Sequence, residues 1–245
     1  MTWNIISPRV GRETAEVLQS YLNIEHPIER EVKVNWGNSA FNLHPSPYVW
    51  GNSTSSVARS VDKGIFFSLC KDLGTVPVVS TVNEVGEPPH GYFIHDDATG
   101  HNGSGVRYTL GVLSVVEAIQ AGKLVTKEVK GQEFRVYFCY NMEPQVYAKV
   151  PLTENTPHNP IQNSFNGYGY IPANVFFKKI SGLQSILKEY TKKVSSRLEL
   201  SYGAVDFIMS EDYTVYVLES NTAPTLFNES LCSSFATAIA EVWNV

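Results

Sequence analysis

Residues 203–209 (GAVDFIM) and 215–221 (VYVLESN) are two mainly apolar runs separated by a short polar segment. Apolar runs of this length predict strands, and so short a connection lets them pair antiparallel as a hairpin. We therefore expect strands at Ala204–Met209 and Thr214–Leu218, joined by a turn at Ser210–Tyr213. This hairpin is the strongest structural signal in the chain.

Three oxygen-bearing side chains belong to this hairpin. Glu219 and Asn221 are two residues apart, so the alternation of side chains along a strand places both on one face. The short turn brings Asp206 opposite them. Two carboxylates and a carboxamide oxygen make a set of hard ligands, which suits Mg²⁺ that also keeps water and phosphate oxygens. The hairpin therefore predicts a magnesium site at Asp206, Glu219 and Asn221.

The whole stretch 202–226 resembles the metal-binding signature of ATP-grasp enzymes, which include D-alanine:D-alanine ligases, glutathione synthetases and the ribosomal-protein glutamate ligases. It also resembles the small ATP-grasp-like proteins of tailed bacteriophages. The resemblance implies that ATP and Mg²⁺ bind between two α+β subdomains, with Asp206 and Glu219 bridging the metal ions and Asn221 ligating one of them. It extends from about Val57 to the C-terminus and is strongest at the hairpin.

Other residues follow the order that this resemblance implies for a nucleotide site. Lys63 opens a helix and would contact the α- or β-phosphate. The segment 124–134, LVTKEVKGQEF, looks like the adenine hinge of the family. Backbone groups of Lys127, Glu128 and Val129 would pair with the adenine edge, and Glu133 would hold the ribose hydroxyls.

The segment 99–105, TGHNGSG, resembles the glycine loop that closes over the phosphates. Glycine lets the backbone approach oxygen atoms closely and turn its N–H groups inward, so Gly103 is expected to contact the nucleotide. His95 precedes this loop where the family usually has Lys or Arg, and we expect it to face the phosphates. Because an unperturbed histidine has a pKa near 6.5, we expect ATP affinity to weaken as the pH rises through that region.

His95, Asp96, Asp97 and His101 allow another interpretation, the transition-metal site of a phosphohydrolase, since imidazole and carboxylate are its usual ligands. Such sites generally rest on helices, whereas this cluster runs into the glycines of segment 99–105. The pattern therefore favours the nucleotide interpretation.

Three further residues match, in order, polar groups that flank the transferred phosphoryl in the glutamate ligases: Arg135, Lys149 and Asn163. Phosphoryl and acyl-phosphate chemistry depends on charge compensation and positioning, so cations are expected there. The chain also departs from the family pattern. It has Gln162 and Ala204 where relatives carry arginine, and Thr225 where they often carry glycine.

Hydrophobic periodicity predicts an α+β fold, because helical and strand-like stretches are segregated along the chain instead of alternating as in a doubly wound sheet. Val57, Val61, Ile65 and Leu69 recur every four residues and predict one helix from Ser55 onward. Further helices are expected at Arg12–Leu22, Val112–Ala121, Leu183–Leu198 and Glu229–Val242. Further strands are expected at Trp3–Ile6, Glu31–Asn35, Val78–Ser80, Gly91–His95, Leu124–Glu128, Glu133–Tyr140 and Pro144–Val150, the last three antiparallel, with a long loop through Pro172.

With these elements, the resemblance divides the chain into three parts. Residues 1–54 are a shortened N-terminal region, 55–124 a small subdomain with the glycine loop, and 125–245 a large subdomain with the metal site.

The composition excludes some classes of protein. The formal charge of −5 gives no general attraction to nucleic acid or to an anionic membrane. A local basic surface remains open as a nucleic-acid site, although a solvated helix face explains the same residues: Lys178, Lys179, Lys188, Lys192, Lys193 and Arg197. Three widely spaced cysteines suggest neither a disulfide framework nor a zinc site. No apolar segment is long enough to span a bilayer, so we expect a cytoplasmic protein.

The resemblance implies an ATP-dependent carboxylate–amine ligase that forms an amide or peptide-like bond through an acyl phosphate. Two alternatives stay open. The protein could bind nucleotide as a regulator or assembly partner without turnover, as the neutral residues at His95 and Gln162 favour, or it could be a kinase using the same metal site. Residues 35–56 and 151–172, which supply acceptor sites in this fold, match no motif, so the carboxylate and the amine stay unidentified. The oligomeric state also stays open.

Overall fold

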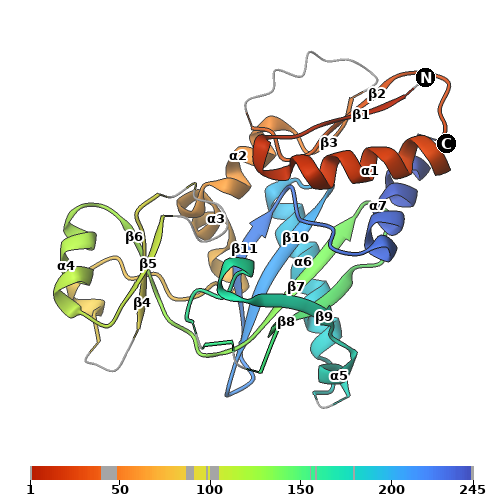
Figure 1. Cartoon of the computed structure of the whole chain (residues 1–245). Coiled ribbons are helices and arrows are strands. Elements are labelled where there is room, and N and C mark those ends of the chain that lie inside the picture. The colour runs from red at the N-terminus through yellow and green to blue at the C-terminus, as the bar shows by residue number, and fades with distance from the viewer. Residues whose placement is uncertain are drawn as a thin grey trace.

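The computed structural model describes residues 2–39, 49–86, 91–97, 99, 105–154, 156–157, 159–178 and 180–243. Figure 1 shows a large twisted sheet in the centre, a small sheet projecting from one side, and an N-terminal layer beside the C-terminal helix. Within the described residues, no helix combines the length and apolarity needed to cross a membrane.

The central sheet is antiparallel, with strand order β11-β10-β7-β8-β9 within the described residues. Its strands are β7 (Gly131–Cys139), β8 (Gln145–Pro151), β9 (Tyr168–Pro172), β10 (Tyr202–Ser210) and β11 (Val215–Asn221). The predicted hairpin is confirmed, and it extends a little further than expected. Asp206 pairs directly with Glu219, next to a register shift between Asp206 and Phe207.

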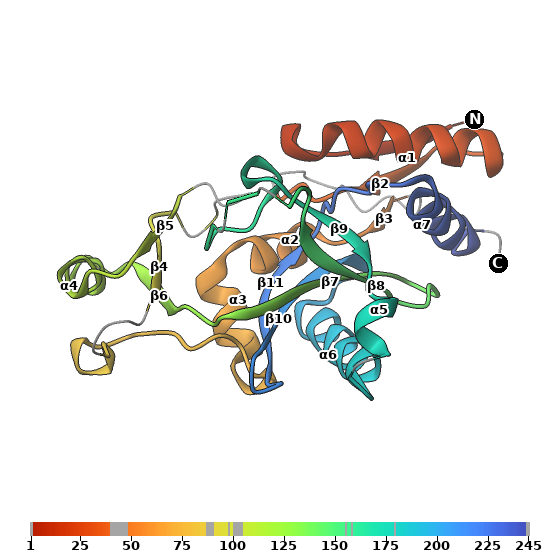
Figure 2. The ribbon, with the colours of Figure 1, turned by 60° about the horizontal axis from the view of Figure 1, so that its bottom comes forward.

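The two faces of this sheet differ in character. Along β7, the buried side chains of Phe134 and Val136 belong to an apolar core that also contains Leu187 and Val194 of helix α6 (Leu183–Leu198). Glu133 and Arg135 alternate with them and lie on the opposite face. One face therefore packs on α6 (Figure 2), while the other carries the polar groups described below.

The small sheet has the order β5-β4-β6 within the described residues and is antiparallel. It consists of β4 (Tyr92–His95), β5 (Val106–Thr109) and β6 (Leu124–Lys127), covered by helix α4 (Val112–Gln120). Tyr92, Ile94, Val115 and Val125 form its separate apolar core. Helices α2 (Thr54–Val61) and α3 (Lys63–Cys70) connect it to the N-terminal layer and pack near β11.

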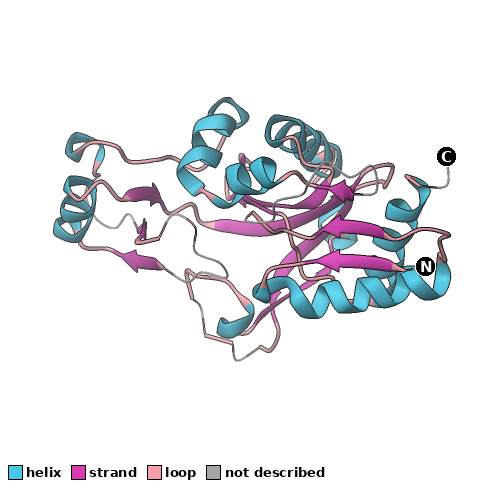
Figure 3. Cartoon of the chain, turned by 90° about the horizontal axis from the view of Figure 1, so that it is seen from above, coloured by secondary structure: helices cyan, strands magenta, loops and turns pink. Residues whose placement is uncertain are grey.

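The N-terminal layer is a parallel sheet of β1 (Trp3–Ile6), β2 (Val32–Asn35) and β3 (Val49–Gly51), with helix α1 (Arg12–Glu25) beside it. It shares a core with helix α7 (Glu229–Glu241), so the two ends of the chain lie together, as Figure 3 shows from above. Short helix α5 (Asn174–Phe177) follows β9. Short 3-10 helices lie at Arg9–Gly11, Lys71–Leu73, Val82–Glu84 and Ser164–Asn166.

Several expected elements differ from the structure. The single helix expected from Ser55 is two helices, because Asp62 has extended backbone angles and caps the second helix by accepting from Ile65 N–H at 3.0 Å. Val78–Ser80 is not a strand and makes only an isolated bridge from Val78 to Thr126.

Strand pairing also departs from expectation. Leu124–Lys127 pairs with β4 of the small sheet, not with Gly131–Cys139. The loop expected through Pro172 contains edge strand β9, whose Gly169 and Pro172 are residue types depleted in strands. Strands β3 and β5 were also missed.

Candidate active site

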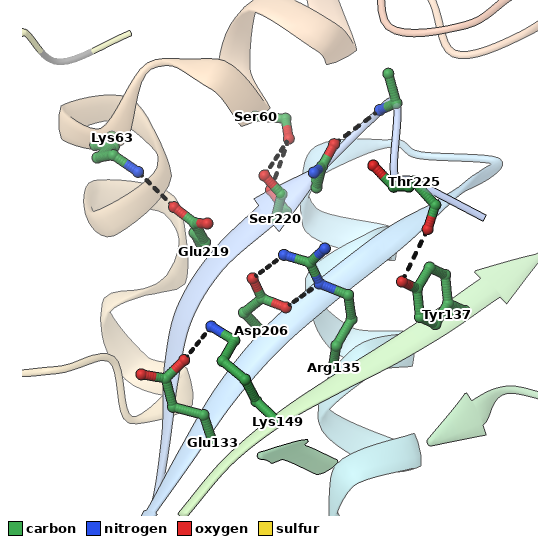
Figure 4. Close-up of polar contacts among 12 residues, drawn as sticks. Ser60, Lys63, Glu133, Arg135, Tyr137, Lys149, Asp206, Glu219, Ser220 and Thr225 are labelled. Carbon is green, nitrogen blue, oxygen red and sulfur yellow. Dashed lines mark hydrogen bonds and ion pairs between the residues drawn. The ribbon is translucent and has the colours of Figure 1, made fainter. Parts of the chain in front are cut away.

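A cavity of about 1010 Å³ opens over the polar face of the central sheet and is also lined by the small sheet and by α2 and α3. Three ion pairs lie along it (Figure 4): Lys63 with Glu219, Arg135 with Asp206, and Lys149 with Glu133. All six residues line the cavity, so the structure brings together the three predicted cations and three of the predicted acidic residues.

Arg135 and Asp206 face one another across the β7–β10 register. The Nε and Nη2 atoms of Arg135 donate to the two carboxylate oxygens of Asp206, each at 2.6 Å. Burial alone would lower the pKa of Arg135, but the charge of Asp206 and these hydrogen bonds outweigh it and raise that pKa. The Asp206 side chain is only 6% exposed, so removal of Arg135 would leave a buried carboxylate without a counter-charge.

Lys63 is the first residue of α3, and Asp62 caps that helix, so the cap aims Lys63 at the hairpin. Its Nζ lies 2.5 Å from Oε2 of Glu219. The charge of Lys63 and this hydrogen bond, with the charges of Arg135 and Lys149, lower the pKa of Glu219 to about 2 although burial opposes them. Glu219 therefore carries a full negative charge at neutral pH.

Lys149 and Glu133 form the third pair on neighbouring strands, with the ammonium group donating to Oε2 of Glu133. Burial raises the pKa of Glu133, and the positive charge of Lys149 counteracts only part of that effect. The sequence predicted Glu133 as a ribose ligand and Lys149 as a phosphoryl contact. In the structure they are partners at one end of the row of charges.

Asn221 follows Glu219 at the end of β11, and its Oδ1 accepts from Ala223 N–H at 3.0 Å. Asp206, Glu219 and Asn221 all line the cavity. Their donor set fits Mg²⁺, because carboxylate and amide oxygens have further lone pairs beyond the hydrogen bonds seen. The Glu219 side chain is 43% exposed and lines the cavity.

The predicted adenine hinge also lines the cavity. Its backbone donors are not equivalent: Lys127 N–H donates to Pro77 O at 2.9 Å and Glu128 N–H donates to Gly91 O at 2.8 Å. Among the described residues, the N–H of Val129 has no hydrogen-bond partner. Backbone groups of all three residues were predicted to pair with adenine; of their N–H groups, that of Val129 is the one available within the described residues.

His95 ends β4 and lines the cavity near Lys63. Its Nε2 lies 3.4 Å from the Thr126 hydroxyl, while Nδ1 is buried with no partner among the described residues. Burial and the charge of Lys63 lower the pKa of His95 to about 4. Without ligand, the imidazole is therefore neutral at physiological pH. Gly103 and His101 lie outside the described residues.

His95→Leu is expected to leave the free energy of unfolding within about 1 kcal/mol of wild type at pH 7, because it removes a buried Nδ1 without a partner together with the long 3.4 Å contact from Nε2 to Thr126. A lowered pKa means that the unfolded state takes up a proton first, so wild type loses stability as the pH falls from about 6.5 to about 4. The variant should lose less and be more stable than wild type at pH 5. Urea unfolding at both pH values measures this; parallel losses would contradict it.

Asn163 and its neighbour Gln162 also line the cavity. Asn163 caps the 3-10 helix Ser164–Asn166, and its side chain accepts from Asn166 N–H at 3.0 Å. It therefore shapes the loop before β9 in addition to facing the cavity.

The rival transition-metal interpretation gains nothing from the structure. Asp96 is held by Arg107 and Lys123, each at 2.5 Å. Among the described residues, no group of three His, Cys, Asp or Glu side chains is placed to hold a metal ion. The charged surface of α6 is also largely paired, since Lys188, Lys193 and Arg197 contact Glu143, Glu189 and Asp72, respectively.

Sequence reasoning missed Tyr170 and Phe227, which both line the cavity. The guanidinium carbon of Arg135 lies 4.8 Å from the centre of the Tyr170 ring, and Lys149 Nζ lies 5.9 Å from it. Phe227 stacks on the same ring at 5.7 Å. No local sequence pattern marks Tyr170, because its role depends on pairing with Lys149 across β8 and β9.

No protein-family model matches the chain, and no curated protein matches it either. Solved structures do match in fold. D-alanyl-alanine synthetase A from Vibrio cholerae has a TM-score of 0.66 at 14% identity, over 100% of this chain and 97% of that one. A D-alanine–D-alanine ligase from Bacillus anthracis has a TM-score of 0.62 at 12% identity, over 98% and 95%. The ligase from Coxiella burnetii has a TM-score of 0.54 at 12% identity, over 79% and 60%.

At identities this low, the structural similarity establishes the shared fold alone. The reaction has to be argued from the site. The similarity to the first of these ligases spans the whole chain, including the N-terminal layer that the sequence placed outside the main resemblance. The chain therefore has the α+β ATP-grasp fold of the D-alanine–D-alanine ligases.

Proposed function

We propose that this protein is an ATP- and Mg²⁺-dependent ligase that joins a carboxylate to an amine. The observation that carries the proposal is the row of three acid–cation pairs in one cavity of an ATP-grasp fold. A polyphosphate with its metal ion needs both signs of charge close together, because the metal takes the carboxylates and the phosphate oxygens take the cations.

In the proposed reaction, a carboxylate oxygen of the substrate attacks the γ-phosphorus of ATP and the bond to the bridging oxygen breaks, so ADP leaves. The amine nitrogen then attacks the carbonyl carbon of the acyl phosphate. The C–O bond breaks, phosphate leaves, and the nitrogen loses a proton. Bound Mg²⁺, held by Asp206, Glu219 and Asn221, would offset negative charge on the phosphates.

Each cation has a place in this scheme. Lys63 holds the α- or β-phosphate, while Arg135 and Lys149 offset charge on the transferred phosphoryl group. Asn163 helps to position that group, and Gly103 belongs to the loop proposed to cover it. Val129 N–H meets adenine beside Lys127 and Glu128, and Glu133, which is paired with Lys149, binds the ribose.

A second candidate is a nucleotide-binding protein without turnover. It is favoured by Gln162 and His95, two neutral groups at positions where cations were expected. His95 is neutral because its pKa is lowered to about 4. The lowered pKa also makes His95 a neutral contact, so we now expect its contribution to ATP affinity to be nearly constant between pH 6 and pH 8.

Mg²⁺ with ATP is expected to raise the melting temperature by about 5 °C or more. A ligand at about 100 times its Kd adds roughly 2.7 kcal/mol, and 1 kcal/mol shifts a chain of this size by about 2–4 °C. Differential scanning fluorimetry with ATP, ADP and a non-hydrolysable analogue measures the shift. No shift with any of the three would disprove nucleotide binding.

Turnover separates the candidates. Hydroxylamine should trap the acyl phosphate as a hydroxamate, with ADP and orthophosphate as the other products. Amine-dependent ADP release supports the ligase, and a stable phosphorylated product indicates a kinase. If the protein binds ATP but releases no ADP when cell extract supplies the carboxylates, it is the non-catalytic protein. AMP and pyrophosphate as products would indicate adenylation chemistry.

A further inference from the structure

Part of the cavity lining is apolar and is not used by the proposed nucleotide chemistry; we call it the apolar wall. Tyr170, Phe227, Leu152 and Ile161 line this part of it. Phe227 remains 40% exposed although its ring also packs at 4.9 Å from the Tyr147 ring and 6.0 Å from the Tyr137 ring. A large aromatic side chain held in a cluster and still facing a cavity is typical of a ligand contact.

The position of Phe227 in this wall is fixed by the segment that follows the hairpin of Asp206, Glu219 and Asn221. The loop 222–227 begins with the turn in which Asn221 accepts from Ala223 N–H, and Tyr137 donates its hydroxyl to Thr225 O at 3.0 Å. Ala223 packs against Gly37, where a side chain would place its Cβ 2.5 Å from that of Ala223. Phe227 therefore has a fixed position relative to the predicted metal ligands.

Two further residues of the wall, Leu152 and Ile161, come from the segment between β8 and β9. Leu152 lies over Gly169, where an added Cβ would be 2.5 Å from Leu152 Cδ2. The carbonyl of Ile161 accepts from the Asn166 side chain at 2.6 Å, and its N–H donates to Asn159 Oδ1 at 2.8 Å. Leu152 N–H donates to Gly167 O at 2.8 Å, so both apolar side chains are presented by a hydrogen-bonded backbone.

A positive charge adjoins this wall. Arg135 and Phe227 both contact the Tyr170 ring, and Asp206 accepts from two nitrogens of Arg135, a side chain with five N–H donors. The remaining donors can bind a second anion, with Lys149 beside them. A ligand with a carboxylate at Arg135 would extend along Tyr170 onto Phe227.

We propose that this wall, Tyr170, Phe227, Leu152 and Ile161, binds an apolar aliphatic or aromatic group of the carboxylate substrate. The inference rests on the proposed ligase function and narrows its substrate class. Carboxylates with a longer apolar group should bind more tightly, because burial of one methylene is worth up to about fourfold in Kd.

The test compares acetate, butanoate, hexanoate and 3-phenylpropanoate. Binding is measured by calorimetry in the presence of Mg²⁺ and a non-hydrolysable ATP analogue, and acyl-phosphate formation by hydroxamate yield with ATP. Hexanoate and 3-phenylpropanoate should bind at least about tenfold more tightly than acetate. Phe227→Ala should remove most of that difference without changing acetate binding.

The matched control is Phe165→Ala, the same change in a side chain that is 83% exposed and does not line the cavity. Phe165→Ala should still bind hexanoate and 3-phenylpropanoate more tightly than acetate. Should Phe227→Ala fail to fold, Leu152→Asn alters the same wall at a side chain that is 65% exposed and should reduce the preference at least about threefold.

The outcomes separate the two proposals. Equal affinities and equal hydroxamate yields for all four carboxylates would overturn the apolar subsite and leave the ligase standing. Graded binding without hydroxamate would support the subsite and contradict the ligase. Absence of binding by every carboxylate would overturn the subsite, as would a preference that Phe227→Ala and Leu152→Asn both retain.

Discussion

Glu219→Gln is expected to retain the fold and to reduce magnesium-dependent turnover by at least about 100-fold. Mutation of a residue that only hydrogen-bonds a metal ligand already costs about 10- to 100-fold in metal affinity or activity. Glu219 is placed to contact the metal directly. The amide keeps the volume and an oxygen for Lys63 but removes the charge that offsets Mg²⁺. Initial rates across a magnesium titration measure the loss. Glu241→Gln, an exposed change at the end of α7, should leave the rate unchanged.

The same variant tests the ion pair without any ligand. The pKa of Glu219 is lowered to about 2 in the folded state, from an ordinary value of 4.5. Its pair with Lys63 therefore adds stability above about pH 4.5, and this is lost as the pH falls toward 2. The gap in unfolding free energy between wild type and Glu219→Gln should narrow between pH 6 and pH 3. Parallel pH curves would show that Lys63 and Glu219 do not pair in solution.

Arg135→Met is expected to lower the free energy of unfolding by about 3 kcal/mol, the second large effect. Removing one partner of a buried ion pair costs roughly 3–5 kcal/mol because the other charge is left uncompensated, and Asp206 is almost fully buried. Urea denaturation measures the loss. Arg12→Met, which removes the cation of an exposed helical pair with Glu16, should cost less than about 1 kcal/mol.

Magnesium sharpens this test. If Asp206 is a metal ligand, Mg²⁺ can supply the positive charge that Arg135→Met removes. About 10 mM Mg²⁺, roughly 100 times a Kd of about 0.1 mM, should then restore about 2–3 kcal/mol of the variant's free energy of unfolding. The double variant Arg135→Met, Asp206→Asn should show no such gain. Equal responses of the two variants to Mg²⁺ would remove Asp206 from the metal site.

The sequence alone determined the elements whose pattern is local. The hairpin carrying Asp206, Glu219 and Asn221 was predictable because two strands joined by a short turn can pair in few ways, and the structure pairs Asp206 with Glu219. Helix Leu183–Leu198 was predicted with its observed bounds, because a long amphipathic repeat signals a helix without tertiary information.

Only the tertiary structure decided which charges meet. Lys63 and Glu219 are 156 residues apart, and Arg135 and Asp206 are 71 apart; no local pattern relates them. Tyr170 joins Arg135 and Phe227 only after β9 pairs with β8, and β6 joins the small sheet instead of the large one. The physical reason is that strand register and helix packing are fixed by burial of contacts between distant segments, whose loop-closure cost is repaid only when the whole core forms.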